Sequence, residues 1–146
     1  ELFVLCTECQ NEDHTQSVTV YRLDHQGSGW VKGPTYQVDV TKISALNSNN
    51  DGSGKKKHKS KQIKFKPSAL CQNPVTHQWY ILSSVNKMLI VAGSDWQVKA
   101  VYHLRRSMFN QPEGLAFDEK GNLYISNEGN KSVPGNILVF NYRKNQ

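Results

Sequence analysis

The feature that most constrains this chain is an internal repeat of about 45 residues. The segment 66–91 contains the blocks Pro-Ser-Ala-Leu, Trp-Tyr-Ile-Leu-Ser-Ser and Met-Leu-Ile-Val. The segment 111–140 contains corresponding blocks, Pro-Glu-Gly-Leu, Leu-Tyr-Ile-Ser-Asn-Glu and Ile-Leu-Val-Phe. Pro67 and Pro112 open the two copies and lie 45 residues apart, which is the period of a four-stranded propeller blade.

A third and incomplete copy of the repeat lies at the start of the chain. Residues 2–8 match the second block and residues 18–21 match the third, but nothing matches the proline-containing first block. The sequence starts with Glu1 rather than Met, so we expect a trimmed chain that begins inside a blade. Because such a unit buries its faces only against neighbours, open ends predict partners. These partners are missing N-terminal blades of the same protein or another copy of the chain.

The pattern predicts an all-β fold: a partial β-propeller of about two and a half four-stranded, antiparallel blades. We expect one propeller fragment over 1–146, with blade pieces at 1–46, 63–104 and 111–142. The last piece lacks an outer strand, and Asp118–Asn122 is a strong hairpin signal. The further predicted elements are strands at 1–6, 17–24, 34–40, 79–83, 87–92 and 97–104 and a helical turn at 41–46.

A lysine-rich insertion over 47–62 separates the first two blade pieces and predicts a mobile loop, because it has almost no apolar residue. Seven lysines lie between residues 55 and 66; subtracting them from the net charge of +6 leaves −1. The high pI therefore does not describe a basic face of the folded part. Only Phe65 could supply stacking near these lysines, so we favour a solvated loop and regard a nucleic-acid partner as disfavoured.

The three cysteines are Cys6, Cys9 and Cys71. Cys6 and Cys9 have CxxC spacing, but no second CxxC follows, and a zinc site needs four converging ligands. An odd offset on one strand also directs two side chains to opposite faces. We therefore expect free or buried cysteines and leave a Cys6–Cys71 disulfide open.

Several blocks resemble the SdiA-regulated (YjiK-like) family of bacterial β-propellers. The resemblance rests on Phe65–Leu70, Tyr80–Lys87, Gln111–Asp118 and the Gly-Asn-Leu-Tyr-Ile-Ser-Asn-Glu-Gly segment 121–129, and it covers most of the chain. It implies the C-terminal part of a six-bladed propeller, with no established activity. It also implies an exported bacterial protein that is periplasmic or attached to the cell envelope. The lysine-rich insertion departs from the family pattern.

Three residues form a candidate metal site at the mouth of the predicted channel. Glu113 opens an innermost strand, and Asn127 and Glu128 end the neighbouring one. Two carboxylates and an amide oxygen suit Ca²⁺, and this block also resembles calcium-dependent propeller hydrolases and lactonases. The equivalent Ser68 and Ser84 of the preceding blade are weak ligands that would line the same site. The alternative is that Glu113 caps backbone N–H groups between blades.

The leading functional hypothesis is a non-catalytic binding or scaffold module that binds an unknown small ligand, with Ca²⁺ as its candidate cofactor. The alternative is a metal-dependent hydrolase acting on an ester, lactone or phosphoester, in which the cation would activate water. No catalytic motif is evident, and no apolar run reaches the length that spans a bilayer. Membrane attachment is therefore expected only through a lipid anchor or another segment of the parent protein.

Overall fold

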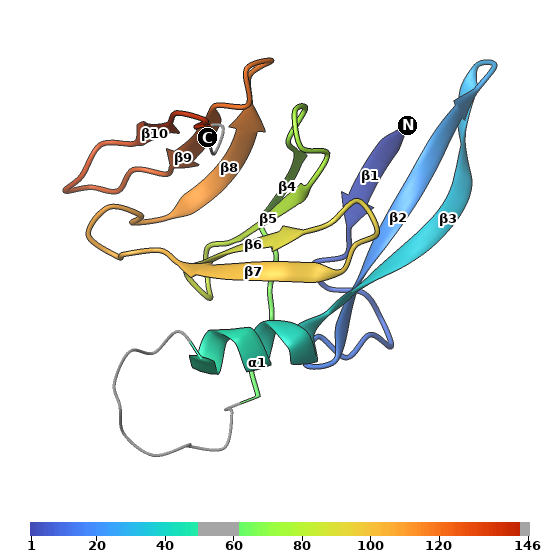
Figure 1. Ribbon diagram of the computed structural model, residues 1–146, viewed down its shortest axis with the longest axis horizontal. Helices are drawn as coiled ribbons and strands as arrows, with labels where there is room; N and C mark the ends of the chain where they lie inside the picture. Colours follow the sequence, from blue (N-terminus) through green and yellow to red (C-terminus); the bar gives the residue numbers. More distant parts are fainter. Residues whose placement is uncertain (50–61, 144–146) are drawn as a thin grey trace.

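The computed structural model describes residues 1–49 and 62–143 and contains three antiparallel sheets that follow one another along the chain (Figure 1). The first has the order β1 (Leu2–Leu5), β2 (Ser17–Gln26), β3 (Gly29–Asp39). The second has the order β4 (Ala69–Gln72), β5 (Trp79–Ser83), β6 (Met88–Ala92), β7 (Val98–His103). The third contains β8 (Pro112–Phe117), β9 (Leu123–Asn127) and β10 (Asn136–Phe140), with β9 in the middle. This all-β architecture confirms the predicted class and is consistent with a partial propeller.

Strands of successive sheets lie beside one another, as in neighbouring propeller blades. β4 neighbours β8, and β1 approaches β4. The single described helix, α1 (Val40–Asn49), follows β3 and packs along β7 (Figure 1). The predicted helical turn therefore continues to residue 49 in the structure. In the predicted insertion 47–62, residues 50–61 lie outside the described residues.

The middle sheet is buried on both faces. Because side chains alternate along a strand, Trp79, Ile81 and Ile90 face the first sheet and join its valines in one core cluster. Leu82 and Leu89 face the third sheet and form a second cluster with Ile125 and others. This arrangement explains why the sequences of β5 and β6 are nearly continuous apolar runs and do not alternate between apolar and polar residues.

An aromatic cluster joins the first sheet to the second. The rings of Trp79 and Trp96 are stacked with centroids 4.4 Å apart, and Phe3 lies 4.7 Å from Trp79. Tyr36 of β3 also stacks on Trp96, with ring centroids 5.5 Å apart. Trp96 has a φ of 65°, a left-handed conformation that costs a non-glycine residue roughly 1 kcal/mol, and this stacking holds it in place.

The predicted Asp118–Asn122 hairpin turn is confirmed and is closed by a carboxylate. Asp118 Oδ1 accepts hydrogen bonds from the backbone N–H groups of Lys120 (3.0 Å) and Asn122 (2.8 Å). Oδ2 accepts a third from the Asn122 side chain. These hydrogen bonds lower the pKa of Asp118 because they stabilise its charged form, and the bond from the Asn122 side chain has the largest effect. Gly121 supplies the positive φ, 82°, that the turn needs.

Two strand predictions need correction. The predicted strands 17–24 and 34–40 are both longer in the structure, because β2 and β3 extend as a twisted hairpin to the Gln26–Gly29 pair and leave only Gly27 and Ser28 in the turn. Strict alternation from Val98 along the predicted strand 97–104 would bury Tyr102, but Tyr102 is 56% exposed. A β-bulge places an extra residue, Lys99, opposite the junction of Val91 and Ala92. This extra residue reverses the alternation beyond it, so Val101 is buried instead.

Within the described residues no helix is both long and apolar enough to cross a membrane.

We predict that the buried tryptophan of β5 carries a large share of stability. Trp79→Ala should lower the free energy of unfolding by about 3–5 kcal/mol, because it opens a cavity between two sheets and removes two aromatic contacts. Trp30→Ala is the matched control; Trp30 is 53% exposed, so the change should stay within about 0.5 kcal/mol. Urea unfolding measures both. Equal losses for the two variants would contradict the packing described here.

We also predict that Asp118 contributes to acid sensitivity. Because its folded-state pKa lies below the ordinary value of 3.8, its stabilising effect is complete above that pH and is lost as the pH falls through the folded pKa. Asp118→Asn should therefore weaken the fall in stability below about pH 4, with little effect on its slope at neutral pH. Unfolding curves of both proteins across this range test the prediction. An unchanged acid slope in the variant would contradict it.

Candidate functional site

The predicted serines lie where β4 begins, and they bond to each other. The backbone N–H of Ser84 donates to Ser68 Oγ at 3.2 Å. The Ser68 hydroxyl also lies 3.4 Å from the carbonyl oxygens of Leu82 and of Pro112. Because Pro112 belongs to the next sheet, Ser68 links the innermost strands of two blades. The structure thus brings Ser68 and Ser84 together, and the Ser68 hydroxyl and the Ser84 backbone N–H form hydrogen bonds within the fold.

The predicted metal residues lie at one end of the β8–β9 ladder. Pro112 pairs with Asn127 and Gly114 with Ser126, so Glu113 is the extra residue of a β-bulge. Glu128 follows immediately, and its N–H donates to the Gln111 carbonyl at 2.7 Å. A Cβ at Gly114 would lie 2.2 Å from Ser126 Oγ, so a larger residue there would force the Ser126 hydroxyl to move. The bulge thus gives Glu113 and Glu128 exposed side chains at the same strand end.

Asn127 is the buried member of this strand-end group. Its amide nitrogen donates to the Met108 carbonyl at 3.2 Å and to Asn136 Oδ1 at 2.8 Å. Its own Oδ1 is buried and has no hydrogen-bond partner among the described residues. The amide is thus fixed by two donor contacts and keeps one free acceptor.

The charge around Glu113 is mixed. Lys87 donates a short hydrogen bond to the Asn110 carbonyl. Burial lowers the pKa of Lys87, Arg106 lowers it further, and Glu113 acts in the opposite direction. Glu113 therefore lies within electrostatic range of an ammonium group, which would compete with a metal cation for its carboxylate.

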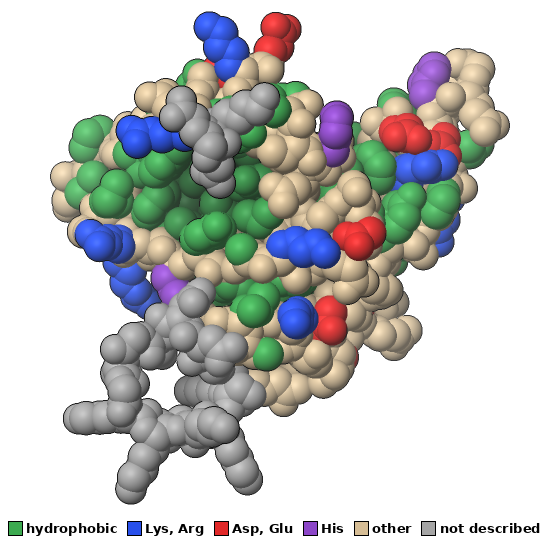
Figure 2. Space-filling view, viewed as in Figure 1, with side chains coloured by type: hydrophobic (Ala, Val, Ile, Leu, Met, Phe, Trp, Pro, Cys, Tyr) green, Lys and Arg blue, Asp and Glu red, His purple; other side chains and the backbone are tan. Residues whose placement is uncertain are grey.

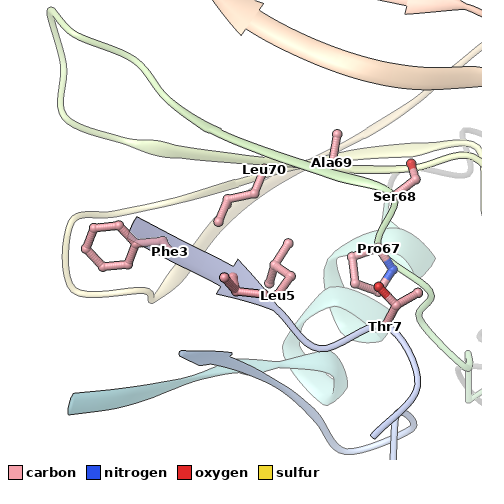
Figure 3. A pocket seen from close by; sticks show the side chains of 8 residues that line it. Phe3, Leu5, Thr7, Pro67, Ser68, Ala69 and Leu70 are labelled. Carbon is pink, nitrogen blue, oxygen red and sulfur yellow. The ribbon is translucent and has the colours of Figure 1, made fainter. Parts of the chain in front are cut away.

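A groove of about 260 Å³ separates β1 from the segment that leads into β4 (Figure 3). On one side lie Phe3, Val4 and Leu5, and on the other side lie Pro67 to Leu70. Among the described strands, β1 pairs only with β2. The Cys6 N–H donates to the Thr19 carbonyl, and hydrogen-bonded pairs alternate along an antiparallel ladder. The N–H groups of Phe3 and Leu5 consequently point to the unpaired edge.

The cysteine prediction was wrong in part, because Cys6 and Cys9 form a disulfide with a Cα–Cα distance of 5.8 Å. The strand argument fails because only the residues that lead up to Cys6 are extended. Cys9 lies in the loop between β1 and β2, and this loop directs its side chain back toward Cys6. Cys71 is a free, partly exposed thiol, so the Cys6–Cys71 pairing is excluded.

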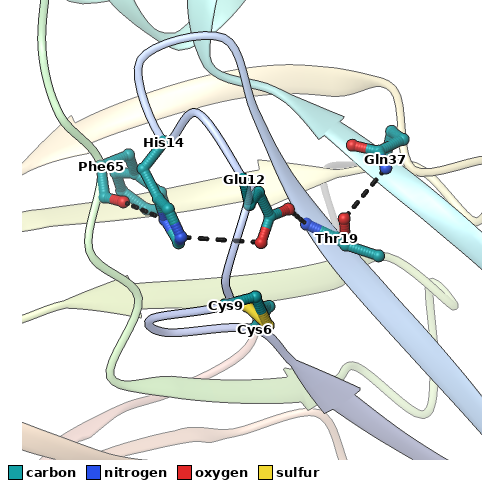
Figure 4. The surroundings of a disulfide bond; sticks show 7 residues. All are labelled: Cys6, Cys9, Glu12, His14, Thr19, Gln37 and Phe65. Atoms are coloured by element: carbon teal, nitrogen blue, oxygen red, sulfur yellow. Dashed lines mark hydrogen bonds and ion pairs between the residues drawn. A yellow bond between two sulfur atoms is a disulfide. The ribbon is translucent and has the colours of Figure 1, made fainter.

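Sequence reasoning missed two residues beside this disulfide, Glu12 and His14 (Figure 4). His14 Nε2 lies 3.6 Å from Glu12 Oε2, and both side chains are largely buried. A second pocket, of about 350 Å³, opens over Cys9 and these two residues. The local signal was a Glu-x-His segment three residues after a CxxC, but only the fold brings the four side chains together.

The comparison with protein families gives one match. The family model described as SdiA-regulated aligns with residues 32–133, which is more than half of the chain. No curated protein and no solved structure shows a match. The matched range contains the strand-end residues Ser68, Ser84, Glu113, Asn127 and Glu128 but not the Cys6–His14 loop. Together with the repeat and the three-sheet architecture, this match shows that the chain belongs to the SdiA-regulated family.

Proposed function

We propose that this chain is a non-catalytic binding and scaffold module: a propeller sector that accepts a further β-strand along β1. The observation that carries this proposal is the unpaired edge of β1, with the Phe3 and Leu5 N–H groups directed over the groove between β1 and the segment that leads into β4. An extended segment that pairs with this edge would satisfy those donors, and its side chains would fill the groove. Val4 lies in the groove and is 42% exposed, which is high for an apolar strand residue.

The repeat indicates the chemistry of the incoming strand. β5 and β9 correspond to β1, and their equivalent edges are covered by β4 and β8. The segments that provide this cover begin Pro-Ser-Ala-Leu and Pro-Glu-Gly-Leu. A strand with the pattern Pro, any residue, small residue, Leu would therefore pair with β1 in the same way. It would lie beside β4 as β4 lies beside β8.

The third sheet also supports a propeller sector with partners, because one of its faces is exposed. Val139 and Val91 are equivalent positions of the repeat, because each pairs with the tyrosine of the neighbouring strand. By the same register, Ile137 is equivalent to Leu89. Leu89 and Val91 are buried, whereas Ile137 and Val139 are 64% and 52% exposed. Figure 2 shows hydrophobic side chains gathered over the region of the third sheet. The partners we propose are further blades of the same protein, with a second copy as the alternative.

The disulfide supports the proposed location. Disulfides persist in oxidising compartments such as the bacterial periplasm, and Cys6–Cys9 joins two ends of a surface loop. We therefore retain the proposal of an exported protein of the periplasm or cell envelope, attached to a membrane only through a lipid anchor or another segment of the parent.

A Ca²⁺ ion at Glu113, Asn127 and Glu128 is the proposed cofactor, supported by the free buried Oδ1 of Asn127. The hydrolase alternative would need a base beside that cation. In the described part of the chain, no hydrogen bond or ion pair joins the side chains of Glu113 or Glu128 to a histidine or aspartate. We therefore favour a binding role over catalysis.

Strand capture is testable with a labelled peptide of residues 66–72 in which Ser replaces Cys71. We expect saturable binding to the full chain by fluorescence anisotropy, and at least tenfold weaker binding to Val4→Asp, because the charge would be desolvated in the groove. Val31→Asp, on β3 and 41% exposed, is the matched control and should bind normally. Absence of binding, or equal binding to both variants, would overturn the proposal. A dimer that Val4→Asp converts to monomer would identify a second copy as the occupant.

Calcium binding is testable by calorimetric titration and thermal unfolding of the full chain with Ca²⁺. We expect heat and a raised Tm, both lost in the Glu113→Gln, Glu128→Gln double variant, since removing both carboxylates removes the site's charge. Glu119→Gln is a suitable control because Glu119 is an exposed carboxylate in a different turn. A wild-type protein that shows neither heat nor a thermal shift would contradict the cofactor proposal.

A further inference from the structure

Three potential metal ligands converge in the loop between β1 and β2, and a fourth, His14, lies beside one of them. The Sγ atoms of Cys6 and Cys9 and a carboxylate oxygen of Glu12 all lie within 4.8 Å of one another. His14 Nε2 lies 3.6 Å from Glu12 Oε2 (Figure 4). The spacing is Cys-x-x-Cys-x-x-Glu-x-His within nine residues, so one loop provides two soft and two borderline or hard donors.

Two of these donors are buried without a hydrogen-bond partner. His14 and Glu12 side chains are 5% and 10% exposed, and His14 Nε2 and Glu12 Oε2 have no hydrogen bond among the described residues. His14 Nδ1 lies 3.2 Å from the Phe65 carbonyl, an acceptor, so Nδ1 must donate. In the neutral ring, Nε2 then carries a lone pair directed toward a carboxylate oxygen. A metal ion placed beside these two acceptors would give both of them a partner.

We propose that the reduced form of this loop binds Zn²⁺ through Cys6, Cys9, Glu12 and His14, and that the disulfide is the metal-free, oxidised form of the same site. Thiolate, imidazole and carboxylate are the ligands that Zn²⁺ takes in tetrahedral sites. Two cysteines separated by two residues have the usual spacing of a zinc-binding pair. With two thiolates and one carboxylate, the ligands carry a charge of −3, so the Zn²⁺ site has a net charge of −1.

The surrounding contacts already orient the ligands. The Nδ1–H of His14 donates to a backbone carbonyl, the outer contact that fixes the ring of a metal-bound histidine. Glu12 Oε1 accepts a short hydrogen bond from the Thr19 N–H, which leaves Oε2 for the metal. Phe65 also donates its N–H to the His14 carbonyl at 3.0 Å. The loop is thus held on both sides by β2 and by the segment before β4.

The conversion between the two forms is a balanced thiol–disulfide exchange. A dithiol reductant gives two electrons and two protons to the Cys6–Cys9 bond, so that two thiols form and the reductant becomes a disulfide. Zn²⁺ then displaces the two thiol protons as both thiolates coordinate. The pocket over Cys9 provides access for both reagents, and at its rim Lys66 is neutralised by Glu8 at 2.7 Å.

The test uses the full chain, reduced with a dithiol and freed from it by anaerobic gel filtration. Reduction should raise the count of reactive thiols from one to three. We expect the reduced protein to bind one Zn²⁺ in competition with a colorimetric chelator and the oxidised protein to bind none. Co²⁺ should give the intense visible bands of a tetrahedral thiolate site. Zn²⁺ should also raise the Tm of the reduced protein only.

Paired variants distinguish the proposed site from nonspecific thiol binding. Cys9→Ser and His14→Gln should each weaken Zn²⁺ binding by about 100-fold or more, beyond the effect of an outer contact. Cys71→Ser and His77→Gln, which change a free thiol and an exposed histidine elsewhere, should bind like the wild type. Cys9 is partly exposed in a loop, so its replacement keeps the test valid where His14→Gln fails to fold. Failure of the reduced wild type to bind Zn²⁺ overturns the proposal. Full affinity in Cys9→Ser, or in a folded His14→Gln, does so as well.

Discussion

The rest of the structure depends on the burial of β5 and β6 between two other sheets. Their alternating side chains contribute to both core clusters, so these strands are the only described ones that contribute buried apolar residues to both faces of a sheet. Trp79 contacts Phe3 on one side, and Tyr80 contacts Phe117 on the other at 4.8 Å. Because burial of apolar area is the main stabilising term, the first and third sheets are held chiefly through this central one.

The same packing leaves the outer sheets incomplete. The first and third sheets each pack one face against the middle sheet. The other face of the third sheet, which carries Ile137 and Val139, is exposed. The edge of β1 is likewise unpaired among the described strands. Such edges and faces favour association with other strands. The proposed role as a propeller sector with partners follows from this asymmetry rather than from any single polar residue.

Much of the fold could be predicted from the sequence, because the repeat determines strand order and turn position. The 45-residue period, the middle blade and the Asp118 turn are local or periodic signals. The bulge at Lys99 could not be predicted, since an extra residue reverses the alternation without changing composition. The strand-end position of Glu113, Asn127 and Glu128 followed from the repeat, but the bulge at Glu113 and the nearby Lys87 did not.

The disulfide loop shows where sequence reasoning reaches its limit. The CxxC was visible, yet the strand rule was applied to a residue that lies in a loop. The orientation of His14 depends on the carbonyl of Phe65, which is 51 residues away in sequence and arrives by tertiary packing. A contact of this range has no local pattern. The Glu-x-His segment only gains meaning once the fold places it beside the two sulfur atoms.

The central claim, that this chain is a propeller sector with a free edge at β1, is tested most directly by amide hydrogen exchange resolved to single residues. The account predicts that Ile81 and Ile90 exchange only through global unfolding, since both are fully buried in the middle sheet. It predicts rapid exchange at Phe3 and Leu5, whose N–H groups point away from β2. Protection at Phe3 and Leu5 equal to that at Ile81, in a protein shown to be monomeric, would contradict the account.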